Sequence, residues 1–538
     1  MMVSNSSYSK ISCLAEALEY AASSSAGLRI FDARGNLTAK ISYQDLYQAA
    51  RMRATQLQGL TRKWPQPAVI GLIAQTSLSF ITDFFACQLV GLLPCPLPPP
   101  PVALGLEAYV RRTRQLLAAV QARMLLFDSI HAPLLDWFER FARSDDPNLQ
   151  LIRSTSLPVP DESLTSQPLK GDAAAYIQLS SGTTHEPKGI QISQHAVCHN
   201  LKAILHEGLQ IKSCDRAFSW LPLHHDMGLV GFLLAPLMGA VPLDLLPPQA
   251  FARRPQIWPN LMAKLGSTVC FAPSFAWGLA ADRTSLEEAQ QLRLNLRIAG
   301  VGGDMVRAHD LNRFTKRFEA SGFAPQSFHP CYGLAEATLA VSMGSSNPDA
   351  LDRLSSGKPL TNWEIRIVDD AGASLPALKS GHIHIRGPAL MTGYWQEGLL
   401  SRLSPQAWFR TEDLGYLTPS GELVVTGRMQ SLLLVRGRNV HAEAIESAIC
   451  EDLQLPHGTV MAFQEERPFS AGIVIAVECG SKDQALRQQW TEAVRKIVFE
   501  TCQDAAEILL VSPRTVKLTT SGKIARQMTL ERLSDQRQ

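Results

Sequence analysis

The sequence predicts an α/β fold, in which a large N-terminal domain of parallel sheets flanked by helices precedes a small α+β domain. Three observations support this prediction. The chain has 538 residues, more than one hydrophobic core usually organises. Its first two thirds alternate short apolar runs with amphipathic segments, as βαβ units do. After about residue 380 the pattern changes to strands that alternate apolar and polar residues. We therefore expect a large domain over residues 1–426 and a small one over 427–538.

In the large domain, AVIGLIA (68–74) predicts a buried strand, and FITDFFACQLVG (80–91) predicts the helix that follows. The proline run PCPLPPPP (94–101) is interpreted as a stiff, extended loop. The alternation then continues in the helix over 109–122, the strand RMLLFD (123–128), the strand AAYIQL (174–179) with a helix near 195–207 after its loop, the helix over 255–266, the strand TVCFAP (268–273) and the segment 292–300.

The uncharged stretches 84–106 and 227–243 are interpreted as buried core. The first contains six prolines, which break a helix, and the second is short and interrupted by glycine and proline. We expect no membrane span.

The C-terminal third predicts a half-exposed strand at HIHIRG (382–387) and a hairpin over 410–428 that turns at Pro419-Ser420-Gly421. A domain boundary is expected near Thr426 to Gln430. Beyond it the sequence predicts a helix at 442–451, strands at 458–463 and 472–478, and a helix over 484–502.

Charge and cysteine content exclude several classes of protein. Lys and Arg number 51 and Asp and Glu number 49, so the net charge of +2 argues against a nucleic-acid or anionic-membrane binder. The ten cysteines show no zinc-type spacing and are interpreted as reduced thiols of a cytoplasmic protein. The first residues have neither the basic nor the apolar region of a signal peptide.

Three segments contain candidate chemical groups. The segment from Leu179 to Gly189 combines a strand end with a Ser/Thr/Gly-rich loop. Such a loop can offer N–H groups and hydroxyls to phosphate oxygens. The alternative is a plain turn. Adjacent His224 and His225 could suggest a metal site. Neighbouring side chains diverge on a regular element, however, which favours hydrogen-bonded core histidines for the pair taken alone. Glu336 is a lone carboxylate in an apolar run and needs a cation such as Mg²⁺, a helix cap or an internal ion pair.

These segments occur in order with three more, and the series resembles the adenylate-forming superfamily of acyl- and aryl-CoA ligases, peptide-synthetase adenylation domains and luciferases. The resemblance spans about residues 30–530. The six motifs are the loop 179–189, WLPLHHDMG (220–228), CYGLAEATL (331–339), TEDLG (411–415), GR (427–428) with RGRN (436–439), and TSGKIAR (520–526).

The resemblance implies ATP and Mg²⁺ as cofactors and activation of a carboxylic acid to acyl-AMP. Catalytic roles fall on Lys523, on Glu336 and on His225 beside the substrate carboxylate, and Thr184 and Glu336 are implied to lie near Mg²⁺. Tyr332 is expected to stack on adenine, and Asp413 and Arg428 to contact the ribose. The other implied nucleotide-binding residues are Ser180, Ser181, Gly182, Thr183, Lys188, Gly302, Gly303, Asp304 and Gly333.

Gln430 occupies the implied hinge, where relatives usually have Asp or Lys. Relatives rotate the small domain between adenylation and thiol transfer, so we expect residues 427–538 to be mobile.

The details look most like fatty acyl-AMP ligases, which pass the acyl group to the phosphopantetheine thiol of an acyl carrier protein. The similar segments are PLPPPP (96–101), LPLHHDMGLVG (221–231), APSFAW (272–277), YGLAEATLAV (332–341) and SSGKPL with WEIRIVD (355–369). The insertion associated with that acceptor is reduced here to Gly344–Leu354. A coenzyme A ligase of the same fold, or a non-catalytic adenylate-binding relative, is therefore an alternative.

A medium or long fatty acid is expected from the subgroup similarity. Phe232, Trp277 and Met227 are candidates for the residues that shape its tunnel.

Overall fold

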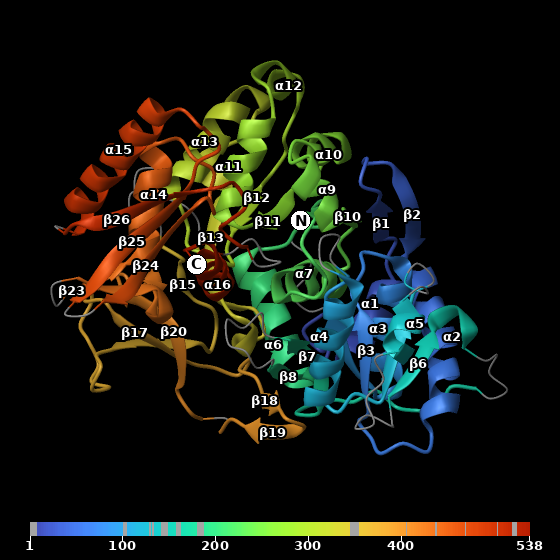
Figure 1. Cartoon of the computed structure of the whole chain (residues 1–538). Helices are drawn as coiled ribbons and strands as arrows, with labels where there is room; N and C mark the ends of the chain where they lie inside the picture. Colours follow the sequence, from blue (N-terminus) through green and yellow to red (C-terminus); the bar gives the residue numbers. More distant parts are fainter. Residues whose placement is uncertain are drawn as a thin grey trace.

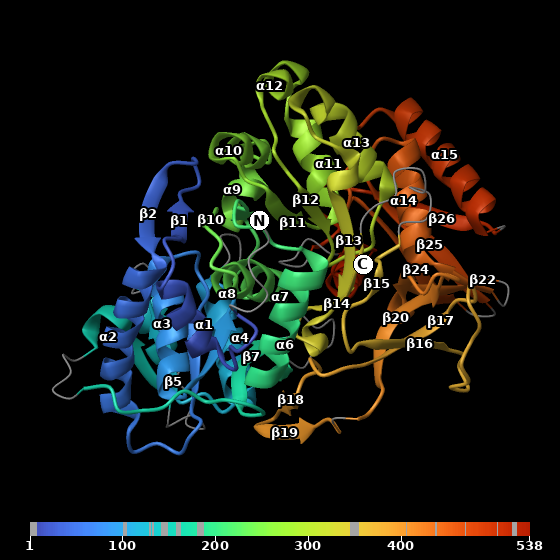
Figure 2. The same cartoon turned by 180° about the vertical axis from the view of Figure 1, so that it is seen from behind.

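The computed structural model describes residues 8–100, 105–128, 131, 134–140, 149–157, 163–179, 188–344, 355–404, 406–435, 438–467, 470–502, 504–518 and 524–537. Figures 1 and 2 show the segments from α14 onward at one side of the molecule, and β1–β6 with α1–α5 at the other. The strands β9–β13 lie between these two groups. None of the helices among the described residues combines the length and apolar character of a membrane span.

The sheet between the two sides has nine strands in the order β15-β14-β13-β12-β11-β9-β10-β1-β2. The strands from β13 to β1 pair in parallel, and antiparallel strands close both ends. Of these parallel strands, β11 and β12 are buried along their whole length, as expected where both faces of a parallel sheet are covered. The strands are β1 (Gly27–Phe31), β2 (Leu37–Ser42), β9 (Ala217–Ser219), β10 (Leu243–Leu245), β11 (Val269–Ala272), β12 (Ile298–Val301), β13 (Phe328–Gly333), β14 (Ala340–Met343) and β15 (Lys358–Pro359).

Helices α11 (Ser274–Arg283) and α13 (Ala308–Phe318) pack together through aromatic side chains. The Trp277 ring meets Phe314 edge-on at 4.8 Å and Phe328 of β13 at 5.5 Å. The other helices of this half are α1 (Leu14–Ala22), α6 (Gln194–Ala203), α7 (Asp226–Leu229), α8 (Ala235–Met238), α9 (Pro248–Arg253), α10 (Ile257–Leu265) and α12 (Leu286–Gln291).

A second parallel sheet has the order β4-β3-β5-β6 and carries α2 (Tyr43–Thr61), α3 (Leu78–Val90), α4 (Leu106–Ala119) and α5 (Leu134–Arg140). Its strands are β3 (Val69–Ile73), β4 (Leu93–Leu97), β5 (Met124–Phe127) and β6 (Gln150–Arg153). The interpretation of 94–101 as a loop is wrong for its first residues, because β4 pairs with β3. Proline is compatible with β4 because this strand lies at the sheet edge, where one side needs no ladder hydrogen bonds.

The segment that contains the Ser/Thr/Gly-rich loop differs from the prediction of a strand, a loop and then a helix, because a second strand precedes the helix. β7 (Ala174–Leu179) pairs antiparallel with β8 (Gly189–Ser193), so the segment between them joins two strands. Helix α6 starts only after β8, where the Ser193 side chain accepts a hydrogen bond from the Ala196 N–H. The same sheet continues through β18 (Gly393–Gln396) and β19 (Leu399–Arg402).

The predicted hairpin over 410–428 is confirmed as β20 (Phe409–Leu417) paired with β21 (Leu423–Arg428). These strands belong to an antiparallel sheet of order β16-β17-β20-β21, with β16 at Glu364–Val368 and β17 at Gly381–Arg386. The register places Asp413 opposite Arg428.

The last part of the chain has its own buried clusters, whose fully buried members all fall between Leu433 and Leu533. A ribbon of β22 (Leu432–Val435) and β23 (Arg438–His441) precedes a sheet of order β24-β25-β26. Its remaining elements are α14 (Ala442–Asp452), β24 (Val460–Arg467), β25 (Ser470–Glu478), α15 (Gln484–Cys502), β26 (Ala506–Val511) and α16 (Arg526–Arg537). The helices and strands predicted here are therefore present, and β22, β23, β26 and α16 are additional.

Candidate active site

A cavity of about 1040 Å³ is lined by residues that follow β9, β12 and β13 and by side chains of the last part of the chain. The carboxyl ends of neighbouring parallel strands meet at one sheet edge, which is where open α/β sheets bind ligands. The cavity has an apolar region and a polar region, and the motifs found in the sequence lie around both.

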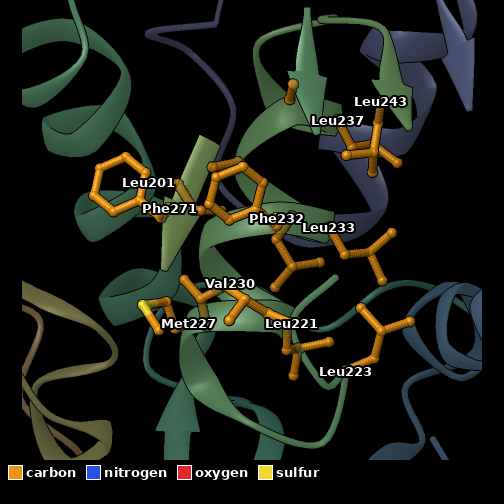
Figure 3. Packing of buried hydrophobic residues seen from close by; sticks show 14 of the residues in the cluster. Leu201, Leu221, Leu223, Met227, Val230, Phe232, Leu233, Leu237, Leu243 and Phe271 are labelled. Atoms are coloured by element: carbon orange, nitrogen blue, oxygen red, sulfur yellow. The ribbon is translucent and has the colours of Figure 1, made fainter. Parts of the chain in front are cut away.

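The apolar region is formed by two helical segments that contain π turns. Residues Ile204–Gly208 extend α6, and Val230–Leu234 join α7 to α8. Figure 3 shows Phe232, from this second segment, near Phe271 of β11, and the two rings are 5.7 Å apart. The apolar lining also includes Ile204, Leu205, Leu209, Ile211, Val241, Val269, Leu339 and Met343.

Two of the three expected tunnel residues thus line the cavity. Met227 and Phe232 do so. Trp277 does not belong to the cavity wall: it is fully buried among Trp258, Phe314 and Phe328. Its proximity to a motif in the sequence was misleading because the indole points into the α11–α13 contact.

In the polar region, Tyr332, Asp413 and Arg428 form one hydrogen-bonded group. The Tyr332 hydroxyl donates to Asp413 Oδ2 at 2.8 Å, and Arg428 Nε donates to Asp413 Oδ1 at 3.1 Å. Burial, followed by the Asp413 charge, raises the pKa of Tyr332 well above its usual value. The Asp413 charge is also the main reason that the pKa of Arg428 is raised. The two hydrogen bonds therefore fix the orientation of the Asp413 carboxylate at the cavity wall.

Glu336 lies in a short 3-10 turn, Ala335–Ala337, after β13. Its Oε1 accepts a hydrogen bond from the Tyr394 hydroxyl at 2.8 Å, and burial raises its pKa. Lys188 Nζ lies 5.6 Å from the centre of the Tyr394 ring. Sequence reasoning missed Tyr394, because it is on β18 and 58 residues from Glu336.

The residues near Glu336 are compatible with a nucleotide-bound Mg²⁺. A buried carboxylate with a raised pKa favours a nearby cation, and its oxygen is the ligand type that Mg²⁺ prefers. Among the described residues, no group of three or more His, Cys, Asp or Glu side chains is arranged to hold a metal ion. The other ligands would be oxygens of a different kind, such as a hydroxyl, phosphate or water oxygen.

His225 and Asp226 form a pair at the wall of the cavity. His225 Nδ1 lies 2.6 Å from Asp226 Oδ1, which also accepts a hydrogen bond from the Met227 N–H. His224 points elsewhere and is absent from the cavity lining. Burial, and secondarily His225, lowers the pKa of His224 to about 3. The two histidines thus diverge, as expected for neighbours in sequence.

The loop after β12 contributes Gly303 and Asp304 to the wall, whereas Gly302 packs against Cys331. Asp304 Oδ2 lies 3.2 Å from Arg307 Nη2 and 3.9 Å from Nε2 of His457, which precedes β24. Gly333 also lines the cavity, and a Cβ there would approach the Leu339 carbonyl to 1.7 Å. Only glycine is compatible with that contact.

Several expected residues lie outside the described part of the chain, namely Ser180, Ser181, Gly182, Thr183, Thr184, Lys523 and the interval 345–354. The backbone of Gln430 is in the 3-10 turn Met429–Ser431, directly after Arg428, and its side chain is not described. The structure thus brings together His225, Glu336, Tyr332, Asp413, Arg428, Lys188, Gly303 and Asp304 around one cavity.

The chain is similar to known proteins in sequence and in fold. A family model described as AMP-binding enzyme matches residues 19–395. A Caulobacter vibrioides protein named "Putative acyl-CoA synthetase" is 31% identical over 95% of this chain and 94% of its own. The medium-chain-fatty-acid–[acyl-carrier-protein] ligase JamA of Moorena producens is 27% identical over 90% and 88%.

Among solved structures, one from a study of fatty acyl-adenylate ligases from E. coli and L. pneumophila superposes with a TM-score of 0.88. It is 32% identical and covers 99% of this chain and 100% of its own. The fold is thus that of a ligase that forms acyl adenylates. The chain belongs to the AMP-binding enzyme family.

Proposed function

We propose that the protein activates a fatty acid with ATP to acyl-AMP and pyrophosphate, and then transfers the acyl group to a phosphopantetheine thiol of an acyl carrier protein. The observation that carries this proposal is the continuity of the cavity. An apolar region around Phe232 and Phe271 leads to a polar region around Asp413 and Arg428. An acyl adenylate has the same sequence of parts, with an alkyl chain, a carbonyl and a nucleotide.

Each region supports one part of the reaction. The Asp413 carboxylate accepts hydrogen bonds from the two ribose hydroxyls, Tyr332 contacts adenine, and Arg428 contacts the same ribose. His225 lies beside the substrate carboxylate at the mouth of the apolar region. Such a transfer depends on alignment of carboxylate and α-phosphorus more than on covalent chemistry.

The remaining roles rest on the motifs. We assign phosphate binding to the loop 180–184 with Lys188, and stabilisation of charge between carboxylate and α-phosphate to Lys523. Glu336 and Thr184 would hold Mg²⁺, which neutralises phosphate charge when bound. The last part of the chain, from residue 427 on, is proposed as a mobile domain hinged at Gln430; its separate buried clusters support this.

The acyl acceptor is inferred from the relatives, and the cellular compartment is inferred from the free cysteines. JamA is named as a ligase for an acyl carrier protein, which supports a carrier thiol. The relative named as an acyl-CoA synthetase supports coenzyme A as the alternative. The ten cysteines are free thiols, which supports a reducing compartment such as the cytoplasm.

One experiment separates the two acceptors. The intact protein is incubated with ATP, Mg²⁺ and a mixed panel of fatty acids, and the acyl-AMP formed is identified by mass spectrometry. Coenzyme A or a phosphopantetheine-bearing carrier protein is then added in parallel reactions. We expect acyl transfer to the carrier. Rapid formation of acyl-CoA instead would assign the protein to the coenzyme A ligases.

A further inference from the structure

The His225–Asp226 pair has a geometry that the activation step does not require. A nitrogen and a carboxylate oxygen 2.6 Å apart must share a proton, since two lone pairs would repel each other. His225 Nδ1 therefore carries a proton directed at Asp226. In the neutral ring, Nε2 is then left with a lone pair.

The local fold fixes this pair. Asp226 is the first residue of α7 and is mostly buried, with 11% of its side chain exposed. Its Oδ1 also accepts the Met227 N–H at 2.7 Å, and Gln178 Nε2 donates to the carbonyl of His224. Both residues of the pair line the cavity. With Nδ1 directed at Asp226, Nε2 is the nitrogen that a ligand in the cavity meets.

We propose that Asp226 is a positioning residue that makes His225 the general base of thiol transfer; this rests on the proposed function above. The substrate carboxylate beside His225 becomes the acyl carbonyl of the adenylate. The thiol therefore attacks next to the ring. An alkyl thiol with a pKa of about 8.5 is mostly protonated at neutral pH, so a nearby base raises the fraction of thiolate.

The step balances without another reactant. The thiol proton moves to His225 Nε2, and the sulfur forms a bond to the acyl carbon. The bond between that carbon and the phosphate oxygen breaks, and AMP leaves as an anion. The imidazolium, stabilised by the Asp226 carboxylate, then returns its proton to water.

Several titratable or charged groups surround the pair. The titratable and charged groups around it are His224 on its own segment, Tyr176 of β7, Cys331 of β13, Glu336 and, at the cavity wall, Lys188. Burial raises the pKa values of Tyr176, Cys331 and Glu336, and the Asp226 charge adds to this effect. These groups stay neutral more readily beside Asp226, which leaves His225 as the base next to the acyl carbonyl.

The test measures the two half-reactions separately in Asp226→Asn. Synthetic dodecanoyl-AMP and pantetheine report transfer in single turnovers, and ATP–pyrophosphate exchange reports activation. An amide at 226 favours the wrong tautomer, so we expect transfer to fall by about 10²-fold or more relative to exchange. Its pH dependence should then follow ionisation of pantetheine alone, and Asp226→Glu should recover part of the rate.

The control is Asp370→Asn, because Asp370 Oδ1 makes a similar contact of 2.8 Å with His382 Nε2 outside the cavity lining. It should change neither half-reaction. Because Asp226 is buried, His225→Ala is measured as well, and added imidazole should restore transfer.

Equal losses in both half-reactions, or a wild-type pH profile in Asp226→Asn, would overturn the role of the pair. The proposed function is tested independently, since it fails if the wild-type protein forms no acyl-AMP from any acid.

Discussion

At the scale of single residues, the candidate site depends on carboxylates that are buried for different purposes. Asp413 is held by Tyr332 and Arg428, whereas Glu336 accepts a hydrogen bond of 2.8 Å from Tyr394 and has a pKa raised by burial. The first arrangement suits an acceptor for hydroxyl groups, and the second suits a carboxylate that pairs with a cation.

Asp413→Asn tests the first of these assignments. The change removes the charge that faces Arg428 and replaces an acceptor by a group that also donates. We expect ATP to bind about ten- to a hundredfold more weakly, because a hydrogen bond to a charged group contributes about 1.5–3 kcal/mol. Calorimetric titration with ATP measures this. Tyr416→Phe on the same strand is the control, and unchanged ATP affinity in Asp413→Asn would refute the assignment.

At the scale of elements, the π segment Val230–Leu234 forms part of the wall of the apolar region. Gly231 lines the cavity there, and a Cβ added to it would come within 3.2 Å of Leu339 Cδ2, the one neighbour found within 4 Å. A side chain at 231 would therefore occupy space that an alkyl chain otherwise fills.

Gly231→Leu should accordingly shift the selectivity of the enzyme toward shorter acids. Each methylene that no longer fits costs about 1–3 kcal/mol, so acids that extend past residue 231 should lose at least about tenfold in kcat/KM. The ratio of rates for a series of acids measures the shift. Gly59→Ala in α2, where an added Cβ meets nothing within 4 Å, is the control. An unchanged ratio would mean that the alkyl chain binds elsewhere.

The sequence predicts elements better than it predicts contacts between them. The apolar runs of β3, β7 and β11 and the hairpin β20–β21 were recognisable because strands and turns have local signatures. The strand β8 was missed, since only pairing with β7 distinguishes it from the loop before it. Tyr394 and the inward direction of Trp277 depend on residues far away in the sequence, and no local pattern indicates them.

At the scale of the whole molecule, the last part of the chain contacts the loop after β12 through His457. Its ring lies 5.7 Å from that of Phe275, with an angle of 25° between the planes, and near Asp304 and Arg307. Burial lowers the pKa of His457 to about 4, helped by Arg307 and opposed by Asp304. The folded protein therefore binds this proton less readily than the unfolded chain does.

This contact predicts a pH dependence of stability. Below a pH of about 6.5, His457 takes up a proton in the unfolded chain but not in the folded protein. The free energy of unfolding therefore decreases as the pH falls toward 4. Between pH 7 and 5 the wild-type protein should lose about 2 kcal/mol more of its free energy of unfolding than His457→Gln. Urea unfolding at both pH values measures the difference. The exposed His195→Gln serves as the control, and identical slopes for His457→Gln and wild type would contradict the account.

The central claim is that one cavity joins an acid to the α-phosphate of ATP. Its most direct test is ATP–pyrophosphate exchange by the intact protein with and without a fatty acid. We expect exchange only in the presence of acid, and we expect Lys523→Ala to abolish it while ATP still binds. Exchange without any acid, or exchange near the wild-type rate in Lys523→Ala, would contradict the account.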